Sequence, residues 1–372
     1  MRTTQLRAGL AVANLLQPFP LIARPAPLGV ALEVRVAQLT SLLKGPFGNE
    51  GAAFASRALN GAAALASECR RPREANRILR GHLAVYAGRD SLSVPAALSM
   101  LEPAADLARL YAVAGHPDLA VTCLTNLMYA VRAGTSVKLD RYVLPLDRVE
   151  GGPDELRLWH EVASARMLGD AVKILNMAAK WPEAADLVTM NGGPGSRLTE
   201  PRQAVIVPHL IGGGLASARR HLEQAQPTQE WETEIASCLS VLAAEPDDRA
   251  DAAAVMIETF QRSAPAAHLA AYRARYGITV TRLAHTTGHQ FASIARQAAA
   301  EAIAVGDGHA ARELLRTVAG CLSRKDIATL ERKVTRAGLR GGALTGHYLS
   351  RLRSTADRAT TILRDSLQTA PR

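Results

Sequence analysis

The sequence predicts an all-α protein built as a stack of helical hairpins. Alanine and leucine supply most of the apolar residues, while aromatic residues make up only 4% of the chain. This composition favours helices, because alanine loses no side-chain entropy in a helix. The two other observations are apolar residues at helical spacing and a short motif that recurs along the chain. A chain of 372 residues is also longer than one compact core usually spans, as expected for a repeat array or two domains.

Apolar residues recur at the spacing of a single helical face. Leu101, Ala105, Ala108 and Ala112 follow one another at intervals of four, three and four residues. Such a stripe is typical of a helix that packs on one side. The segment 154–179 contains no proline and predicts one long helix.

The recurring motif consists of a turn, a proline or small residue, an alanine three residues later, and then an apolar run. Its physical meaning is a joint between two helices. A glycine or basic residue suits the end of the first helix, and proline suits the first position of the second, where its missing N–H costs nothing. Clear copies begin at Pro72, Pro117, Pro182 and Leu215, and weaker copies lie at 248–253 and 306–311.

Two intervals between these joints are close to the period of a known repeat, while Pro72 and Pro117 are 45 residues apart and Pro117 and Pro182 are 65 apart. Pro182 and Leu215 are 33 residues apart, and Leu215 and Ala250 are 35 apart, close to the roughly 34-residue tetratricopeptide period. Over residues 49–319 the chain resembles the divergent tetratricopeptide-like proteins of GC-rich bacteria. Arginine supplies 38 of the 44 basic residues, a skew that GC-rich coding produces. The resemblance implies a right-handed α-solenoid whose first helices line a concave groove.

We expect three segments along the chain. Residues 1–28 form an N-terminal helix and a proline-rich stretch, residues 29–338 form the repeat array, and residues 339–372 form a basic C-terminal capping helix. The segment 136–149 interrupts the pattern, because alternating apolar residues flank Asp140-Arg141 as in a small β-hairpin. This hairpin is either a tolerated surface insertion or a functional loop that closes over one end of the groove.

The charge is strongly basic and unevenly placed. The formal net charge is +10, and residues 310–372 hold 13 basic residues against five acidic ones. The basic C-terminal helix is either a cap with a solvated outer face or a patch for RNA, DNA or an acidic partner. No recognition-helix module or run of stacking aromatics supports a nucleic-acid function.

No catalytic, cofactor or metal signature stands out in the sequence. His160-Glu161 begins like a zinc-protease helix, but Ser164 replaces the second histidine, and His285 and His289 have no acidic companion at useful spacing. The glycines of 212–214 follow an apolar run, but they lack the spacing of a phosphate-binding turn. We therefore expect no metal and no cofactor.

Four cysteines stand far apart and form no CxxC motif. Buried free thiols in a cytoplasmic protein are the expected state. The first apolar stretch, residues 10–16, is too short for a membrane span, so no membrane partner is expected.

The candidate binding residues are long polar side chains inside helices that are otherwise rich in small residues. They are Arg57, Asn60, Arg109, Arg166 and Lys173, all on expected first helices of hairpins. A row of such side chains over an alanine-lined groove suits an extended or acidic peptide. The alternative is an ordinary solvated face.

The function that follows is a non-catalytic scaffold or adaptor that binds a protein or peptide partner in its groove. One alternative is a regulatory sensor for a small molecule or signal peptide. Another is an accessory enzyme of a specialised biosynthetic pathway, for which His160, Glu161 and His209 are the residues to inspect. The fold alone does not decide among them.

Overall fold

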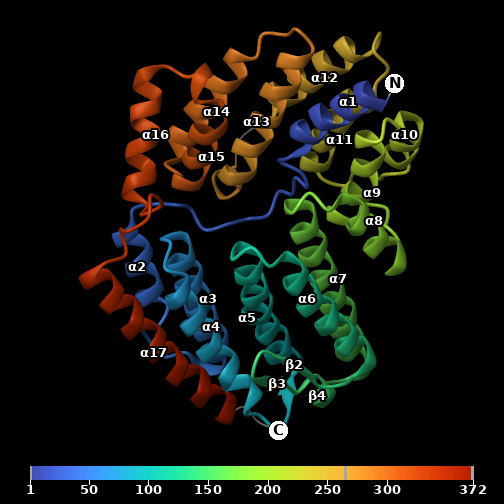
Figure 1. Cartoon of the computed structure of the whole chain (residues 1–372). Helices are drawn as coiled ribbons and strands as arrows, with labels where there is room; N and C mark the ends of the chain where they lie inside the picture. Colours follow the sequence, from blue (N-terminus) through green and yellow to red (C-terminus); the bar gives the residue numbers. More distant parts are fainter. Residues whose placement is uncertain (1, 264–265, 370–372) are drawn as a thin grey trace. The chain divides into compact units, whose positions relative to one another are not determined.

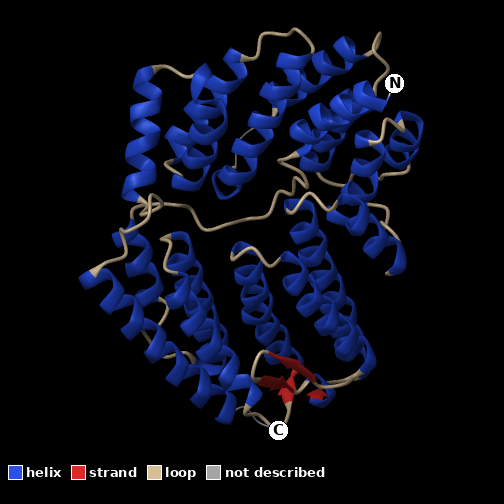
Figure 2. Cartoon of the chain, in the orientation of Figure 1, coloured by secondary structure: helices blue, strands red, loops and turns tan. Residues whose placement is uncertain are grey.

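The computed structural model describes residues 2–263 and 266–369. Within this part of the chain it contains seventeen α-helices, a few 3-10 turns and two short two-stranded sheets (Figures 1 and 2). The all-α prediction is therefore confirmed. None of the described helices has both the length and the apolar character needed to cross a lipid bilayer.

The chain divides into two compact units, each made of two separate stretches of sequence. Unit 1 consists of residues 1–30 and 175–337, and unit 2 consists of residues 31–174 and 338–372. The long helix α7 (Pro153–Met177) contains the boundary in its last turn. It matches the single long helix expected over 154–179.

The elements of unit 1, in chain order, are α1 (Arg2–Leu16), α8 (Trp181–Met190), α9 (Glu200–Ile211), α10 (Leu215–Glu223), α11 (Glu230–Ala243), α12 (Arg249–Arg262), η3 (Ala267–Leu269), α13 (Ala270–Thr286), α14 (Ala292–Val305), α15 (Gly308–Val318), η4 (Ala319–Cys321) and α16 (Arg324–Arg336). Those of unit 2 are α2 (Leu32–Ser41), η1 (Gly48–Glu50), α3 (Gly51–Glu68), α4 (Pro72–Ala87), β1 (Leu92–Ser93), α5 (Val94–Val113), α6 (Pro117–Ala133), β2 (Val137–Leu139), β3 (Tyr142–Leu144), η2 (Leu146–Arg148), β4 (Val149–Glu150) and α17 (Gly346–Thr369).

Helices that are neighbours in sequence pack against each other as hairpins. In unit 2 these pairs are α3 with α4 and α5 with α6, and in unit 1 they include α11 with α12, α13 with α14 and α15 with α16. Helices two apart in sequence also pack together, as α3 does with α5 and α11 and α15 do with α13. Each hairpin therefore lies beside the next within its unit (Figure 1).

Four of the predicted joints share one backbone geometry. In each, one residue takes the left-handed conformation, and the N–H of the following residue donates to a carbonyl five residues earlier, which is the hydrogen bond of a Schellman motif. The left-handed residues are Arg70, Gly115, Ala179 and Gly213, with φ of 58°, 92°, 57° and 75°. The hydrogen bonds are Arg71 to Ala66 (2.8 Å), His116 to Tyr111 (2.9 Å), Lys180 to Leu175 (2.9 Å) and Gly214 to His209 (2.8 Å).

The alanine that follows each joint is fully buried. Ala75, Ala120 and Ala218 lie three residues into α4, α6 and α10, and none of them is exposed. In α8 this position falls on Ala184 rather than the expected Ala185, because that helix begins one residue earlier, at Trp181. A methyl group at this point allows the two helices of a hairpin to approach closely.

The C-terminal helix packs on the first hairpin of unit 2. Leu352, Ala356, Ala359 and Leu363 of α17 are 0–2% exposed, and the helix contacts α2, α3 and α4. These four residues form the buried face of this helix.

An ion pair at Glu74 of α4 links α17 to the hairpin. Arg353 of α17 donates to its Oε2 atom from Nε (3.1 Å) and Nη2 (2.8 Å), and Arg77 donates to Oε1 (2.9 Å). Burial alone would raise the pKa of Glu74, but the hydrogen bonds from the two arginines outweigh it and hold the pKa below its usual value.

The segment 136–149 forms the predicted β-hairpin. Strands β2 and β3 pair antiparallel with Val137 opposite Leu144, and Asp140 turns the chain with φ of 54°. Buried Leu139 and Leu144 seat the hairpin against α6 and α4. A parallel pair of two-residue strands, β1 and β4, was not predicted, since a strand of this length leaves no periodic pattern.

We predict opposite effects of two exchanges at equivalent joint positions of unit 1. Gly213→Ala should lower the free energy of unfolding by about 1 kcal/mol, because alanine is strained at positive φ. No atom lies within 4 Å of the added Cβ, so the cost comes from the backbone alone. Ala179→Gly should leave stability unchanged or raise it by up to about 1 kcal/mol. Urea unfolding of both variants measures this, and a loss of stability in Ala179→Gly would contradict the shared geometry.

We also predict that acid weakens the attachment of α17. Because the pKa of Glu74 is lower in the folded state, its contribution is complete above the unfolded pKa of about 4.3 and is lost as the pH falls through the folded pKa. Urea unfolding between pH 6 and pH 3 should show a smaller loss of stability in Glu74→Gln than in the wild type. The control Glu33→Gln removes an exposed carboxylate of α2. If the stability of Glu74→Gln falls with pH as steeply as that of the wild type, Glu74 is not the group that makes the attachment of α17 sensitive to acid.

Candidate functional site

Three of the five candidate residues meet in one cluster on the first helices of unit 2. Asn60 lies on α3, Arg109 on α5 and Arg166 on α7. The side-chain amide of Asn60 donates to Glu102 of α5, and Arg166 donates to the other oxygen of the same carboxylate (3.2 Å). Glu102 therefore connects α3 to α7.

A second bridge lies further along the same helices. Arg109 donates to Asp106 on its own helix and to Asp170 of α7 (3.1 Å). The side chain of Asp170 is only 5% exposed, whereas that of Arg109 is 40% exposed. The arginine thus reaches from the surface to a buried carboxylate.

We call the six residues Asn60, Glu102, Asp106, Arg109, Arg166 and Asp170 the polar ladder. Its acidic members were missed by sequence reasoning, although a signal for them exists. Glu102 and Asp106 precede Arg109 by seven and three residues on one face of α5, and Arg166 precedes Asp170 by four on α7. Residues at this spacing share a helical face.

The two remaining candidates lie beside the ladder. Lys173 is half-buried on α7, one turn after Asp170. Arg57 is exposed on α3, one turn before Asn60, and its guanidinium lies 5.8 Å from the centre of the Phe54 ring. Arg57 is thus the exposed cation at this end of the α3 face.

The row of long polar side chains that the sequence suggested includes arginines that are paired in the ladder. Both ladder arginines are paired with carboxylates, so the cluster is nearly balanced. Burial raises the pKa of Asp106, and the nearby Glu102 and Asp170 add to that effect, although Arg109 opposes it. Burial lowers the pKa of Arg109, but Asp106 and Asp170 outweigh burial and the net shift is upward. The network links adjacent helices.

One polar atom of the ladder has no partner. The Oδ1 atom of Asn60 is buried and accepts no hydrogen bond, while its Nδ2 atom is used by Glu102. Leaving such an acceptor unpaired costs about 1–3 kcal/mol. One turn earlier on α3, Ser56 is fully engaged, since its hydroxyl lies 2.8 Å from that of Tyr86 and 3.4 Å from Nε2 of His82. Asn60 is therefore the ladder residue that holds an unsatisfied acceptor.

Unit 1 holds a different, enclosed cluster around Arg273. Its guanidinium donates to Glu301 (2.7 Å) and to the carbonyl of Phe260 (2.9 Å), and lies 3.8 Å from the Phe260 ring centre. Tyr272 donates to the neighbouring Glu234 (2.6 Å). Arg273 and Glu234 are 5% exposed. This cluster ties α11, the end of α12, α13 and α14 together and leaves its charged groups little access to a ligand.

The residues considered for an enzyme belong to different units. His160 and Glu161 are exposed on α7, in unit 2, whereas His209 belongs to unit 1 and stacks on His221 with ring centres 5.4 Å apart. Burial and the neighbouring His209 lower the pKa of His221. Among the described residues there is no group of three or more histidine, cysteine, aspartate or glutamate side chains that could hold a metal ion. All four cysteines are free thiols.

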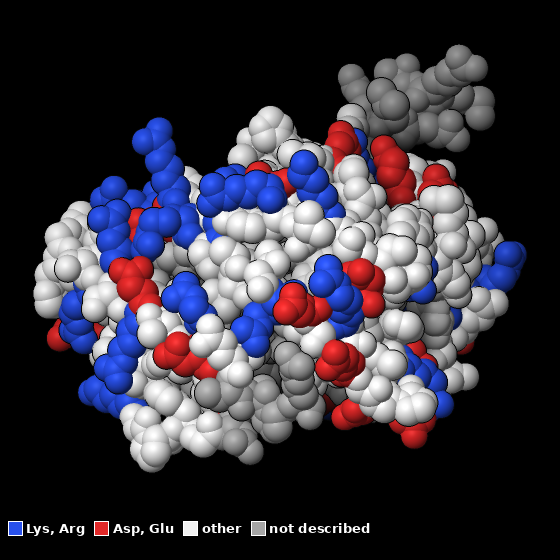
Figure 3. Space-filling view, turned by 90° about the horizontal axis from the view of Figure 1, so that it is seen from below, with Lys and Arg blue, Asp and Glu red and all other residues white. Residues whose placement is uncertain are grey.

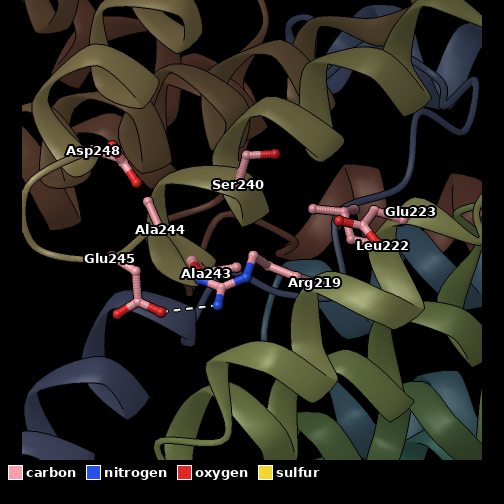
Figure 4. A pocket seen from close by; sticks show the side chains of 8 residues that line it. All are labelled: Arg219, Leu222, Glu223, Ser240, Ala243, Ala244, Glu245 and Asp248. Atoms are coloured by element: carbon pink, nitrogen blue, oxygen red, sulfur yellow. Dashed lines mark hydrogen bonds and ion pairs between the residues drawn. The ribbon is translucent and has the colours of Figure 1, made fainter.

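Two of the surface pockets formed by described residues lie away from the ladder. The pocket in Figure 4, of about 540 Å³, lies between α10, α11 and the turn before α12, and Arg219 crosses it to Glu245 (2.8 Å). The other, of about 820 Å³, lies along α17 beside Arg353 and Asp357. Neither is lined by Asn60 or Arg109, the feature that would have favoured a small-molecule sensor.

The basic residues of the C-terminal helix are interleaved with acids. Arg353 pairs with Glu74, and Asp357 pairs with Arg77 at 3.5 Å. Figure 3 likewise shows basic side chains gathered on part of one face with acidic ones between them. This arrangement is unlike the continuous basic stripe of a nucleic-acid surface.

We predict that the ladder stabilises unit 2. Arg109→Ala leaves Asp106 and Asp170 without their shared cation and should lower the free energy of unfolding by about 2 kcal/mol at pH 7. Because burial raises the pKa of Asp106 and Arg109 opposes that effect, the deficit should shrink at acid pH, where protonation of Asp106 removes the charge that Arg109 offsets. The matched control Arg57→Ala should cost less than about 0.5 kcal/mol. Equal losses in the two variants, measured by urea unfolding, would show that Arg109 is not part of a network.

Comparisons of the chain with protein-family models, with curated proteins and with solved structures found no match.

Proposed function

We propose that the chain is a tetratricopeptide-like repeat protein of a GC-rich bacterium, that its hairpins stack as a right-handed α-solenoid, and that it acts in the cytoplasm as a non-catalytic scaffold or adaptor. The partner is a protein or peptide segment bound across the first helices of unit 2. The shared joint geometry and the packing of helices two apart in sequence support the repeat assignment.

The observation that carries the binding proposal is the polar ladder with its unpartnered acceptor. Three successive first helices place polar side chains in one cluster, and the Oδ1 atom of Asn60 lacks a donor. An extended peptide offers backbone N–H groups along its length, and one of them would satisfy this buried atom once the Asn60 side chain turns to expose it. The free-energy cost of the unpaired acceptor is then removed, and this contributes to binding.

The charges of the surface indicate what the partner carries. Arg109 and Arg166 are already neutralised by acids. An acidic side chain of the partner is therefore expected to meet exposed Arg57 rather than the ladder itself. The ion pairs also hold the surface rigid before binding, which reduces the entropy cost of association.

We predict that changes on α3 remove a specific partner and that a matched change on α4 does not. Wild-type chain, the double variant Arg57→Glu/Asn60→Ala and the control Arg73→Glu serve as baits in a pull-down from native lysate. Arg73 is exposed on the second helix of the same hairpin, so its exchange alters the same charge on the other helix. A partner retained by the wild type and the control should bind the double variant at least tenfold more weakly after purification.

Two results would overturn this function. One is a partner that binds the double variant as tightly as the wild type, which would remove the α3 face from recognition. The other is a nucleic acid retained by all three baits and released by salt, which would point to the basic surface. Circular dichroism of each bait confirms that the exchanges leave the helices folded.

A further inference from the structure

The N-terminal arm, residues 17–30, is an extended peptide bound along unit 1. It follows α1, which packs on α9 and α13, and it carries no helix or strand of its own. Its contacts resemble the way a protein holds a peptide ligand: backbone groups are recognised at a few points and apolar side chains fill buried positions. Phe19 and Leu21 are the buried side chains, at 2% and 1% exposure.

The first recognition point is Leu21, held by the side chain of Gln203 on α9. The N–H of Leu21 donates to Oε1 of Gln203 (2.8 Å), and Nε2 of Gln203 donates back to the carbonyl of Leu21 (2.8 Å). The second N–H of the amide donates to the carbonyl of Leu198 (2.9 Å). Gln203 is fully buried and uses its acceptor and both of its donors.

The second recognition point is Gly29, which is held by residues at the start of α15. Its N–H donates to Oδ2 of Asp307 (3.2 Å), and its carbonyl accepts from the N–H of Gly308 (2.9 Å). The other oxygen of Asp307 caps α15 through the N–H of Ala310 (2.8 Å), which fixes the carboxylate in place. A Cβ atom at Gly29 would lie 2.9 Å from the backbone nitrogen of His309, so this position admits only glycine.

Between these two points the arm is open to solvent. Residues 24–27 are exposed. Ala26 donates to the carbonyl of His268 (3.1 Å), and Arg24 pairs with Glu200 although its own side chain is 56% exposed. The prolines of the arm favour an extended backbone before it binds. The arm is therefore attached mainly at its two ends, eight residues apart.

None of these contacts depends on the arm belonging to the same chain. We propose that unit 1 carries a second peptide-binding site, distinct from the polar ladder, and that the arm is its occupant in cis. The ligand class is an extended, proline-containing peptide. It has an apolar residue whose backbone binds Gln203, and a glycine eight residues later. Because the arm is tethered, its effective concentration is about millimolar, so a peptide in trans binds only when the arm has left.

The test uses the full chain and a fluorescein-labelled peptide with the sequence of residues 16–30. Phe19→Ser/Leu21→Ser weakens the arm and leaves the site intact, so it should bind the peptide at least tenfold more tightly than the wild type does in fluorescence anisotropy. Adding Gln203→Ala should reverse the gain. A peptide with Gly29→Val is the matched control and should bind at least tenfold more weakly. A folded arm variant that gains no affinity would overturn the proposal.

A second measurement decides the case in which the arm variant fails to fold. Hydrogen exchange of the wild type compares the amides of Leu21 and Gly29 with that of Val280, which is buried in α13. An arm that opens locally exchanges at least a hundredfold faster than Val280. Equal protection of the three amides would show that the arm leaves only on global unfolding, and the proposal would fail. Both experiments report on unit 1 alone, so they are independent of the function proposed for the ladder.

Discussion

The structure depends on one backbone constraint, the left-handed residue that ends a helix and allows the next to begin within two residues. At four joints the same hydrogen bond, from an N–H to a carbonyl five residues earlier, closes this turn. Once the turn is fixed, the following helix must return along the first, and a buried alanine sets how closely the two approach. Hairpin packing, and with it the placement of polar side chains on the first helices, follows from this local geometry.

The sequence predicted what is local and repeated. Prolines and small residues marked the helix starts, and alternation around Asp140 marked the β-hairpin, because such features act within a few residues. The exact start of α8 was missed by one residue, since Trp181 joins that helix ahead of Pro182. The composition of each unit was out of reach, because the attachment of residues 1–30 to later helices and of α17 to α3 depends on contacts between distant segments.

The candidate site shows the same limit. Asn60, Arg109 and Arg166 stood out in the sequence because long polar side chains are unusual in helices rich in small residues. Their partners Glu102, Asp106 and Asp170 did not stand out. Acidic residues are common on helices, and the sequence does not show which residues of the facing helix they contact. The structure therefore shows that part of the expected row of long polar side chains belongs to a paired network, and exposed Arg57 is the cation beside it. Gln203, buried beneath the N-terminal arm, carried no sequence signal at all.

The described part of the chain contains two kinds of polar cluster, which differ in exposure. The cluster around Arg273 is enclosed and joins helices, whereas the ladder is partly exposed and retains an unsatisfied acceptor at Asn60. Recognition at the ladder is the central claim, and photo-crosslinking in cells tests it most directly. A photoreactive residue in place of exposed Ala53, one turn before Arg57 on α3, should capture one partner and lose it when Asn60→Ala is added, while the same residue in place of Arg73 should capture none. Capture from position 73 alone, or equally from both positions, would contradict the account.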